Sequence, residues 1–160
     1  MGQLGHGGPG PRHRVEVQRR EQDPRLVVAD TPWGRLGLSI CYDIRFPQLY
    51  RALAKAGAAM IAVPAAFTVP TGEAHWETLL RARAIETGSY VLAPAQAGTH
   101  EDGRKTWGRS TVVAPWGEVI AKLDHDEPGV LFATLDLDAV TRARAAVPQL
   151  SHDREFGAPS

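Results

Sequence analysis

Apolar and polar residues alternate along positions 35–41 and predict a β-strand there. Leu36, Leu38 and Ile40 fall on one face of such a strand, because successive side chains in a strand point to opposite sides. An apolar run at 25–30 precedes it, and the sequence Thr-Pro-Trp-Gly between the two runs favours a turn. We therefore expect a β-hairpin over these two runs.

A helix is predicted from Pro47 to Gly57. Apolar side chains recur there at helical spacing, proline suits the first helical position, and glycine suits the end. The apolar run at 58–66 lacks alternation, which is typical of a strand buried on both faces. Strand, helix and strand in this order predict a βαβ unit with parallel pairing and a right-handed crossover.

A longer helix is predicted at 71–88. Thr71 is expected to cap it, Glu77 and Arg81 are spaced to pair across one turn, and Gly88 suits its end. Its apolar stripe consists of Trp76, Leu79, Leu80 and Ala84. Beyond it, the pattern predicts a short helix at 138–147, a hairpin at 110–123 and strands at 90–98 and 129–137. These elements together indicate an α/β fold.

The two ends of the chain differ from the middle. Residues 1–25 carry few apolar side chains and are rich in glycine, proline, arginine and glutamine. Such a segment cannot bury enough apolar surface to offset the entropy lost on ordering. We therefore expect 1–25 to be a disordered or unrelated segment, 26–156 to be the folded part, and 157–160 to be a tail.

Composition narrows the function classes. The 160 residues balance 18 basic against 18 acidic side chains, so charge gives no case for nucleic acid or an anionic membrane as a partner. The chain has no apolar run near 18 residues and no secretory pattern at its start, so we expect a cytoplasmic protein. One cysteine allows no intrachain disulfide, and the six histidines are not at metal-ligand spacing. We expect no metal and no cofactor.

Cys41 is the candidate for chemistry. It is expected at the carboxyl end of a strand with a helix beginning a few residues later, where α/β folds present nucleophiles. The amides of Tyr42 and Asp43 could stabilise an oxyanion, and the helix start favours a thiolate. The alternative is that Cys41 is a small buried apolar residue, as most free cysteines are. Likewise, Asp43 and Arg45 could simply form a surface salt bridge.

The segment "ICYDI" at 40–44, followed by Phe46-Pro47, resembles the signature of the nitrilase, or carbon–nitrogen hydrolase, superfamily. The stretches 64–96 and 108–121 are similar to its branch of ω-amidases and deaminated-glutathione amidases. The resemblance implies a four-layer α-β-β-α sandwich. It also implies amide or nitrile hydrolysis by a glutamate, a lysine and a cysteine, without a metal.

The resemblance assigns roles to five residues. Cys41 matches the nucleophile, which attacks the carbonyl carbon of a small amide to form a thioester. Arg45 matches the residue that binds a substrate carboxylate, a role that suits its planar fork of donors. Tyr42, Phe67 and Thr71 resemble residues that line the substrate site. Core packing for Phe67 and helix capping for Thr71 remain alternatives.

Other parts of the pattern are missing. In the family the glutamate and the lysine precede the cysteine, whereas Lys55, Lys105 and Lys122 all follow Cys41. We therefore expect the C-terminal half of a hydrolase domain, truncated and inactive alone, with a non-catalytic remnant or interaction module as the alternative. The resemblance implies a homodimer in the full-length family. His75 is expected in core packing or at a subunit interface.

Overall fold

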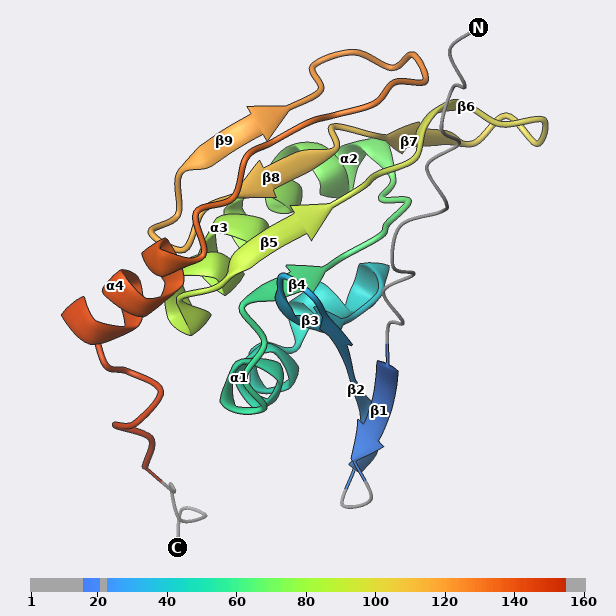
Figure 1. Cartoon of the computed structure of the whole chain (residues 1–160). Helices are drawn as coiled ribbons and strands as arrows, with labels where there is room; N and C mark the ends of the chain where they lie inside the picture. The colour runs from blue at the N-terminus through green and yellow to red at the C-terminus, as the bar shows by residue number, and fades with distance from the viewer. Residues whose placement is uncertain (1–15, 21–22, 155–160) are drawn as a thin grey trace, which may run out of the picture.

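The computed structural model describes residues 16–20 and 23–154. Seven strands form one sheet in the order β1-β2-β3-β4-β5-β8-β9, which runs in Figure 1 from blue to orange. β6 and β7 form a separate two-stranded sheet. The strands are β1 (Glu16–Arg20), β2 (Asp23–Thr31), β3 (Gly34–Leu38), β4 (Met60–Ala62), β5 (Tyr90–Ala93), β6 (Ala97–Thr99), β7 (Lys105–Trp107), β8 (Thr111–Val113) and β9 (Val119–Lys122).

The local predictions around β3 are confirmed. β2 and β3 form the expected antiparallel hairpin, in which Val27 lies opposite Leu38. Helix α1 (Pro47–Lys55) then connects β3 to β4, which pair in parallel with Leu36 opposite Met60. This is the predicted βαβ unit. Only three residues of the apolar run 58–66 lie in a strand, although most of that run is buried.

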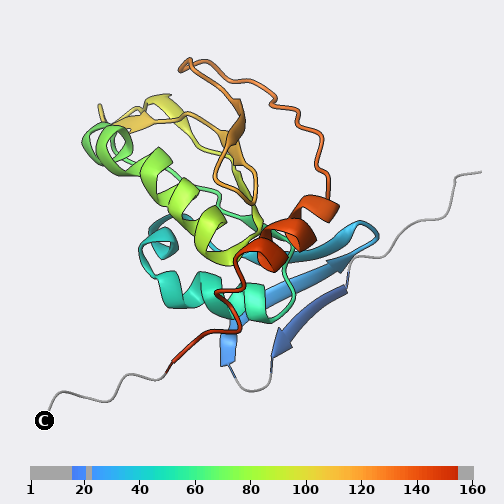
Figure 2. The same ribbon diagram turned by 90° about the vertical axis from the view of Figure 1, so that its left-hand side faces the viewer.

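The sheet is covered on both faces. On one face, α1 and the main helix α3 (Glu77–Thr87) lie side by side and enclose a core that includes Ile61, Val91 and Val113 (Figure 2). Residues of the opposite strand faces, among them Met60 and Tyr90, form a second cluster with helix α4 (Asp138–Ala146). The chain is thus a mixed α/β fold, as predicted. The described residues contain no second large sheet, so the four-layer sandwich stays a prediction.

The main helical segment begins earlier than predicted. α2 (Val69–Thr71) leads into a π-helical turn, Gly72–Trp76, and then into α3. Thr71 therefore lies inside the helix, where its hydroxyl contacts that of Thr68 at 2.9 Å, and its expected capping role was wrong. The predicted stripe is confirmed, because Trp76, Leu80 and Ala84 are buried.

The predicted pair between Glu77 and Arg81 was also wrong. The Glu77 carboxylate lies 3.0 Å from Lys122 on β9. Arg81 donates instead to the carbonyl of Gly117, at 2.8 Å. Both side chains face the β8–β9 hairpin, so partners on another element replace the one a helical turn away.

Two further expectations differ from the structure. Residues 16–20, within the segment expected to be disordered, form β1 and pair with β2. Residues 1–15 and 155–160, including the expected tail, lie outside the described residues.

The segment 129–137 is not a strand, and Val130 and Phe132 in it are exposed. Its alternating pattern turns Leu131 and Leu135 inward, but its backbone pairs with no strand among the described residues. No helix in the described part of the chain is long and apolar enough to cross a membrane.

Candidate active site

Cys41 follows the end of β3 in an unusual backbone conformation. Its φ is 45°, a left-handed value that side-chain-bearing residues seldom adopt. Its amide donates to the carbonyl of Pro64 at 2.8 Å, which ties the residue to the chain leaving β4. Its half-buried side chain packs against the main core. Strain of this kind occurs at functional residues, where the surrounding fold holds a side chain in a required place.

A tight 3₁₀ turn, Cys41–Arg45, separates Cys41 from α1. The Asp43 carboxylate accepts the Ile40 amide at 2.9 Å, and the Asp43 amide donates back to the Ile40 carbonyl at 2.9 Å. This reciprocal pair closes the turn. The amide of Asp43 is thus already used, which removes one of the two expected oxyanion donors. The Asp43 side chain serves the turn and does not pair with Arg45.

Cys41 opens into a cavity of about 550 Å³. Ser110 lines it from β8's amino end and is fixed there, since its hydroxyl accepts the amide of Ala95 at 2.9 Å. The wall is mostly apolar, with Gln96 as its only amide side chain. The remaining lining residues are Ile40, Pro64, Ala65, Ala66, Pro94, Ala95 and Gly129. Such a space suits a small molecule held by a few polar groups.

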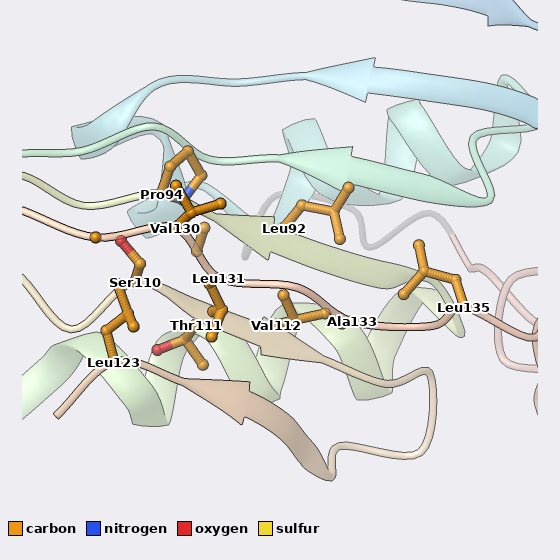
Figure 3. A pocket seen from close by; sticks show the side chains of 12 residues that line it. Leu92, Pro94, Ser110, Thr111, Val112, Leu123, Val130, Leu131, Ala133 and Leu135 are labelled. Carbon is orange, nitrogen blue, oxygen red and sulfur yellow. The ribbon is translucent and has the colours of Figure 1, made fainter.

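Two further cavities adjoin this one, since both share Ser110 and Gly129 with it. One, of about 480 Å³, is polar and is lined by His100, Arg109 and Asp126, among others. The other, of about 420 Å³, is apolar and lies between the sheet and the extended segment 129–135. Figure 3 shows side chains from β5, β8 and that segment converging on the apolar cavity.

Arg45 lies in an aromatic setting. Its guanidinium carbon is 5.4 Å from the ring centre of Tyr42 and 5.3 Å from that of Phe67. Both terminal nitrogens of Arg45 are 3.4 Å from Nδ1 of His75. Within the described ranges, no carboxylate forms an ion pair with Arg45. Phe67 is buried, so it serves core packing and the Arg45 site together.

The structure brings Tyr42, Arg45 and Phe67 together, and none of the three lines the cavity into which Cys41 opens. Thr71 contacts Thr68 instead. His75 is exposed rather than packed in the core, and its contact with Arg45 was missed by the sequence reasoning. The only available signal was a histidine near a helix start, which does not reveal a partner thirty positions away.

A buried polar network lies behind the Cys41 turn. Arg83 donates to the carbonyl of Ile44 at 2.8 Å and pairs with Glu86 at 2.7 Å. The Tyr50 hydroxyl lies 2.8 Å from the Ser39 hydroxyl, just before Cys41 in the chain. Burial raises the pKa of Tyr50 to about 12, and burial also raises the pKa of Glu86 although Arg83 opposes this. These contacts fix both ends of the turn, and the sequence pattern did not predict them.

The three lysines lie away from Cys41. Lys55 ends α1, Lys105 begins β7, and Lys122 on β9 pairs with Glu77. None of them lines the cavity into which Cys41 opens. Among the described residues, no three His, Cys, Asp or Glu side chains gather in a way that could hold a metal ion.

Comparison with known proteins gives consistent results. The carbon–nitrogen hydrolase family matches residues 6–145. Human deaminated glutathione amidase is 50% identical over 147 residues, which are 91% of this chain and 45% of that protein. The crystal structure of the Caenorhabditis elegans NitFhit protein superposes with a TM-score of 0.76 at 52% identity, over 79% of this chain and 31% of that one.

A third match is a mutant of the amidase from Nesterenkonia sp. AN1, described with acrylamide added to its active-site cysteine by Michael addition. It is 34% identical, with a TM-score of 0.62 over 78% of this chain and 48% of that one. The chain spans about half the length, or less, of the curated relatives it matches. The family match covers most of the chain and agrees with the fold. The chain belongs to the carbon–nitrogen hydrolase family.

Proposed function

We propose that Cys41 is the nucleophile of an amidase that acts on small amides bearing a carboxylate. The observation that carries this proposal is the backbone of Cys41, held at a φ of 45° where the side chain opens into a cavity of about 550 Å³. The Nesterenkonia relative, whose active-site cysteine takes up acrylamide, supports the assignment. So do the relatives named deaminated glutathione amidase.

In this reaction, the Cys41 sulfur attacks the amide carbonyl carbon and the carbonyl π electrons move to oxygen. Collapse of this intermediate breaks the carbon–nitrogen bond, and the nitrogen leaves as ammonia after taking up a proton. Water then attacks the thioester, releasing the carboxylic acid and restoring the thiol. The cavity wall orients the amide, and Arg45 binds a carboxylate at the other end of the substrate. Tyr42 and Phe67 hold the Arg45 guanidinium in place from two sides.

In this proposal Cys41 is the nucleophile and Arg45 binds the carboxylate, while no lysine among the described residues lines the Cys41 cavity. In the proposed triad, the lysine would stabilise the oxyanion and a glutamate would act as the base. We therefore propose that chain 1–160 by itself does not turn over amides. Assembly as a homodimer, which the family resemblance implies, and a cytoplasmic location, which the sequence pattern predicts, are part of the same proposal. Thr71 is retained as a substrate-site residue only through that resemblance.

Acylation by an activated ester tests whether Cys41 is a nucleophile, independently of the lysine and the glutamate of the proposed triad. The mono-4-nitrophenyl ester of glutaric acid has a good leaving group and a free carboxylate, so it needs no general acid. Chain 1–160 should release one equivalent of nitrophenolate in a burst, and mass spectrometry should find the glutaryl group on Cys41. Cys41→Ala is the matched control and should show no burst. The neutral butyrate ester should react more slowly, since it cannot use Arg45.

Two results would count against this proposal. One is a wild-type acylation rate no greater than that of free cysteine at the same pH, which would indicate an inert thiol. The other concerns the missing groups: steady ammonia release from α-ketoglutaramate or deaminated glutathione, abolished by Cys41→Ala, would show that chain 1–160 is complete for catalysis.

A further inference from the structure

His75 occupies the end of Arg45 that a carboxylate would use. Nη1 and Nη2 of Arg45 both lie 3.4 Å from Nδ1 of His75. These two nitrogens form the fork that binds a carboxylate through two parallel hydrogen bonds. Guanidinium only donates, so His75 binds this fork through Nδ1 in the tautomer that leaves Nδ1 without a proton. The imidazole and a substrate carboxylate therefore compete for the same donors.

We propose that His75 is a specificity-determining residue that makes carboxylate binding at Arg45 dependent on pH. A neutral His75 fills the fork. A protonated His75 has no lone pair for Arg45, is repelled by the guanidinium, and adds a second positive charge to the same site. This inference rests on the proposed role of Arg45 and assigns the ligand as the terminal carboxylate of a small acid or amide acid.

The contact between the two side chains is easily replaced. At 3.4 Å it is longer than the usual range for hydrogen bonds from nitrogen. A single nitrogen of the imidazole also faces both donors of Arg45. A carboxylate offers the guanidinium two oxygens and a negative charge, whereas a neutral imidazole offers one nitrogen and no charge. His75 is exposed and Arg45 is half-buried, so His75 can leave without disturbing the core.

The charged side chains near His75 in the described residues do not weaken its interaction with Arg45. On its own helix, Glu73 and Glu77 are each two positions away, and residues at that spacing do not share a face. Glu77 is also paired with Lys122, at 3.0 Å. On the Cys41 turn, Asp43 binds the Ile40 amide. The other groups packed on Arg45 are the rings of Tyr42 and Phe67.

The test measures binding of glutaramate, a small amide acid whose single carboxylate stays ionised from pH 6 to pH 8. NMR titration of chain 1–160 at these two pH values gives the affinities. Wild-type protein should bind about fivefold or more tightly at pH 6, which is the lower end of typical coupling between two linked events. His75→Ala opens the fork permanently and should bind equally at both pH values, with higher affinity than wild type at pH 8.

His75→Gln supplies the matched control, because its amide oxygen can accept from Arg45 at every pH. This variant should bind weakly at both pH values, which a purely structural role for His75 would not produce. Arg45→Ala should remove binding altogether. A wild-type affinity that is equal at pH 6 and pH 8, or a pH dependence that persists in His75→Ala, would overturn the inference.

The outcome is separable from that of the acylation test. Absence of glutaramate binding at both pH values overturns the role of His75 even when Cys41 is acylated in a burst. A pH-dependent affinity that His75→Ala abolishes supports it even when Cys41 proves inert.

Discussion

Replacing Cys41 by glycine should stabilise the fold relative to Cys41→Ala, although glycine ordinarily weakens an ordered position. Cys41 has a φ of 45°, and the left-handed region costs a residue with a side chain roughly 1–2 kcal/mol. Changing alanine to glycine also raises the conformational entropy of the unfolded chain. This lowers the free energy of unfolding by about 0.4–1 kcal/mol at an unstrained position. The strain term is the larger of the two. We therefore expect Cys41→Gly to exceed Cys41→Ala in free energy of unfolding by about 1 kcal/mol.

The same chemical change at a neighbouring site gives the control. Ala66 lines the same cavity, is exposed and does not have a positive φ, so Ala66→Gly should destabilise the protein by about 0.4–1 kcal/mol. Urea unfolding followed by circular dichroism gives the free energies, and the m-values show whether the comparison is valid. If glycine costs as much at position 41 as at position 66, Cys41 is not strained. The proposed role of Cys41 as a nucleophile would then have no support from its backbone geometry.

Two further predictions concern the residues that support the site. Tyr50 has a pKa raised to about 12 by burial, so above pH 10 the unfolded state loses a proton that the folded state keeps. Stability should then fall by roughly 2–3 kcal/mol between pH 10 and pH 12, and Tyr50→Phe should remove most of that loss in urea titrations across this range. Gly72→Ala should destabilise the protein by about 1–3 kcal/mol, because a Cβ there would overlap the Trp107 side chain. A Gly72→Ala variant of higher melting temperature than wild type would show that Trp107 moves aside freely.

Much of the fold could be predicted because its signals are local. Pro47 and Gly57 mark the ends of α1 closely, and the turn between β2 and β3 follows from its residues. The segment 129–137 shows the limit of such signals. Leu131 and Leu135 do face the cavity against the sheet, yet a strand also requires a neighbouring backbone to receive its hydrogen bonds. Apolar periodicity reports which side chains are buried and contains no information about that neighbour.

The same distinction between local signals and contacts from distant segments explains which parts of the candidate site could be predicted. The end of a strand and the start of a helix are features of adjacent residues, and they make Cys41 a candidate nucleophile. The family resemblance then favours that role over a small buried apolar residue. The surroundings of Arg45 could not be predicted from the sequence. His75 reaches Arg45 from another element and Phe67 reaches it from a third, and only the packed fold sets those distances. Arg45 itself was assigned by resemblance, which gives a role without a geometry. The geometry adds that the two terminal nitrogens of Arg45 already face the imidazole of His75, and this juxtaposition is what the proposed role of His75 rests on.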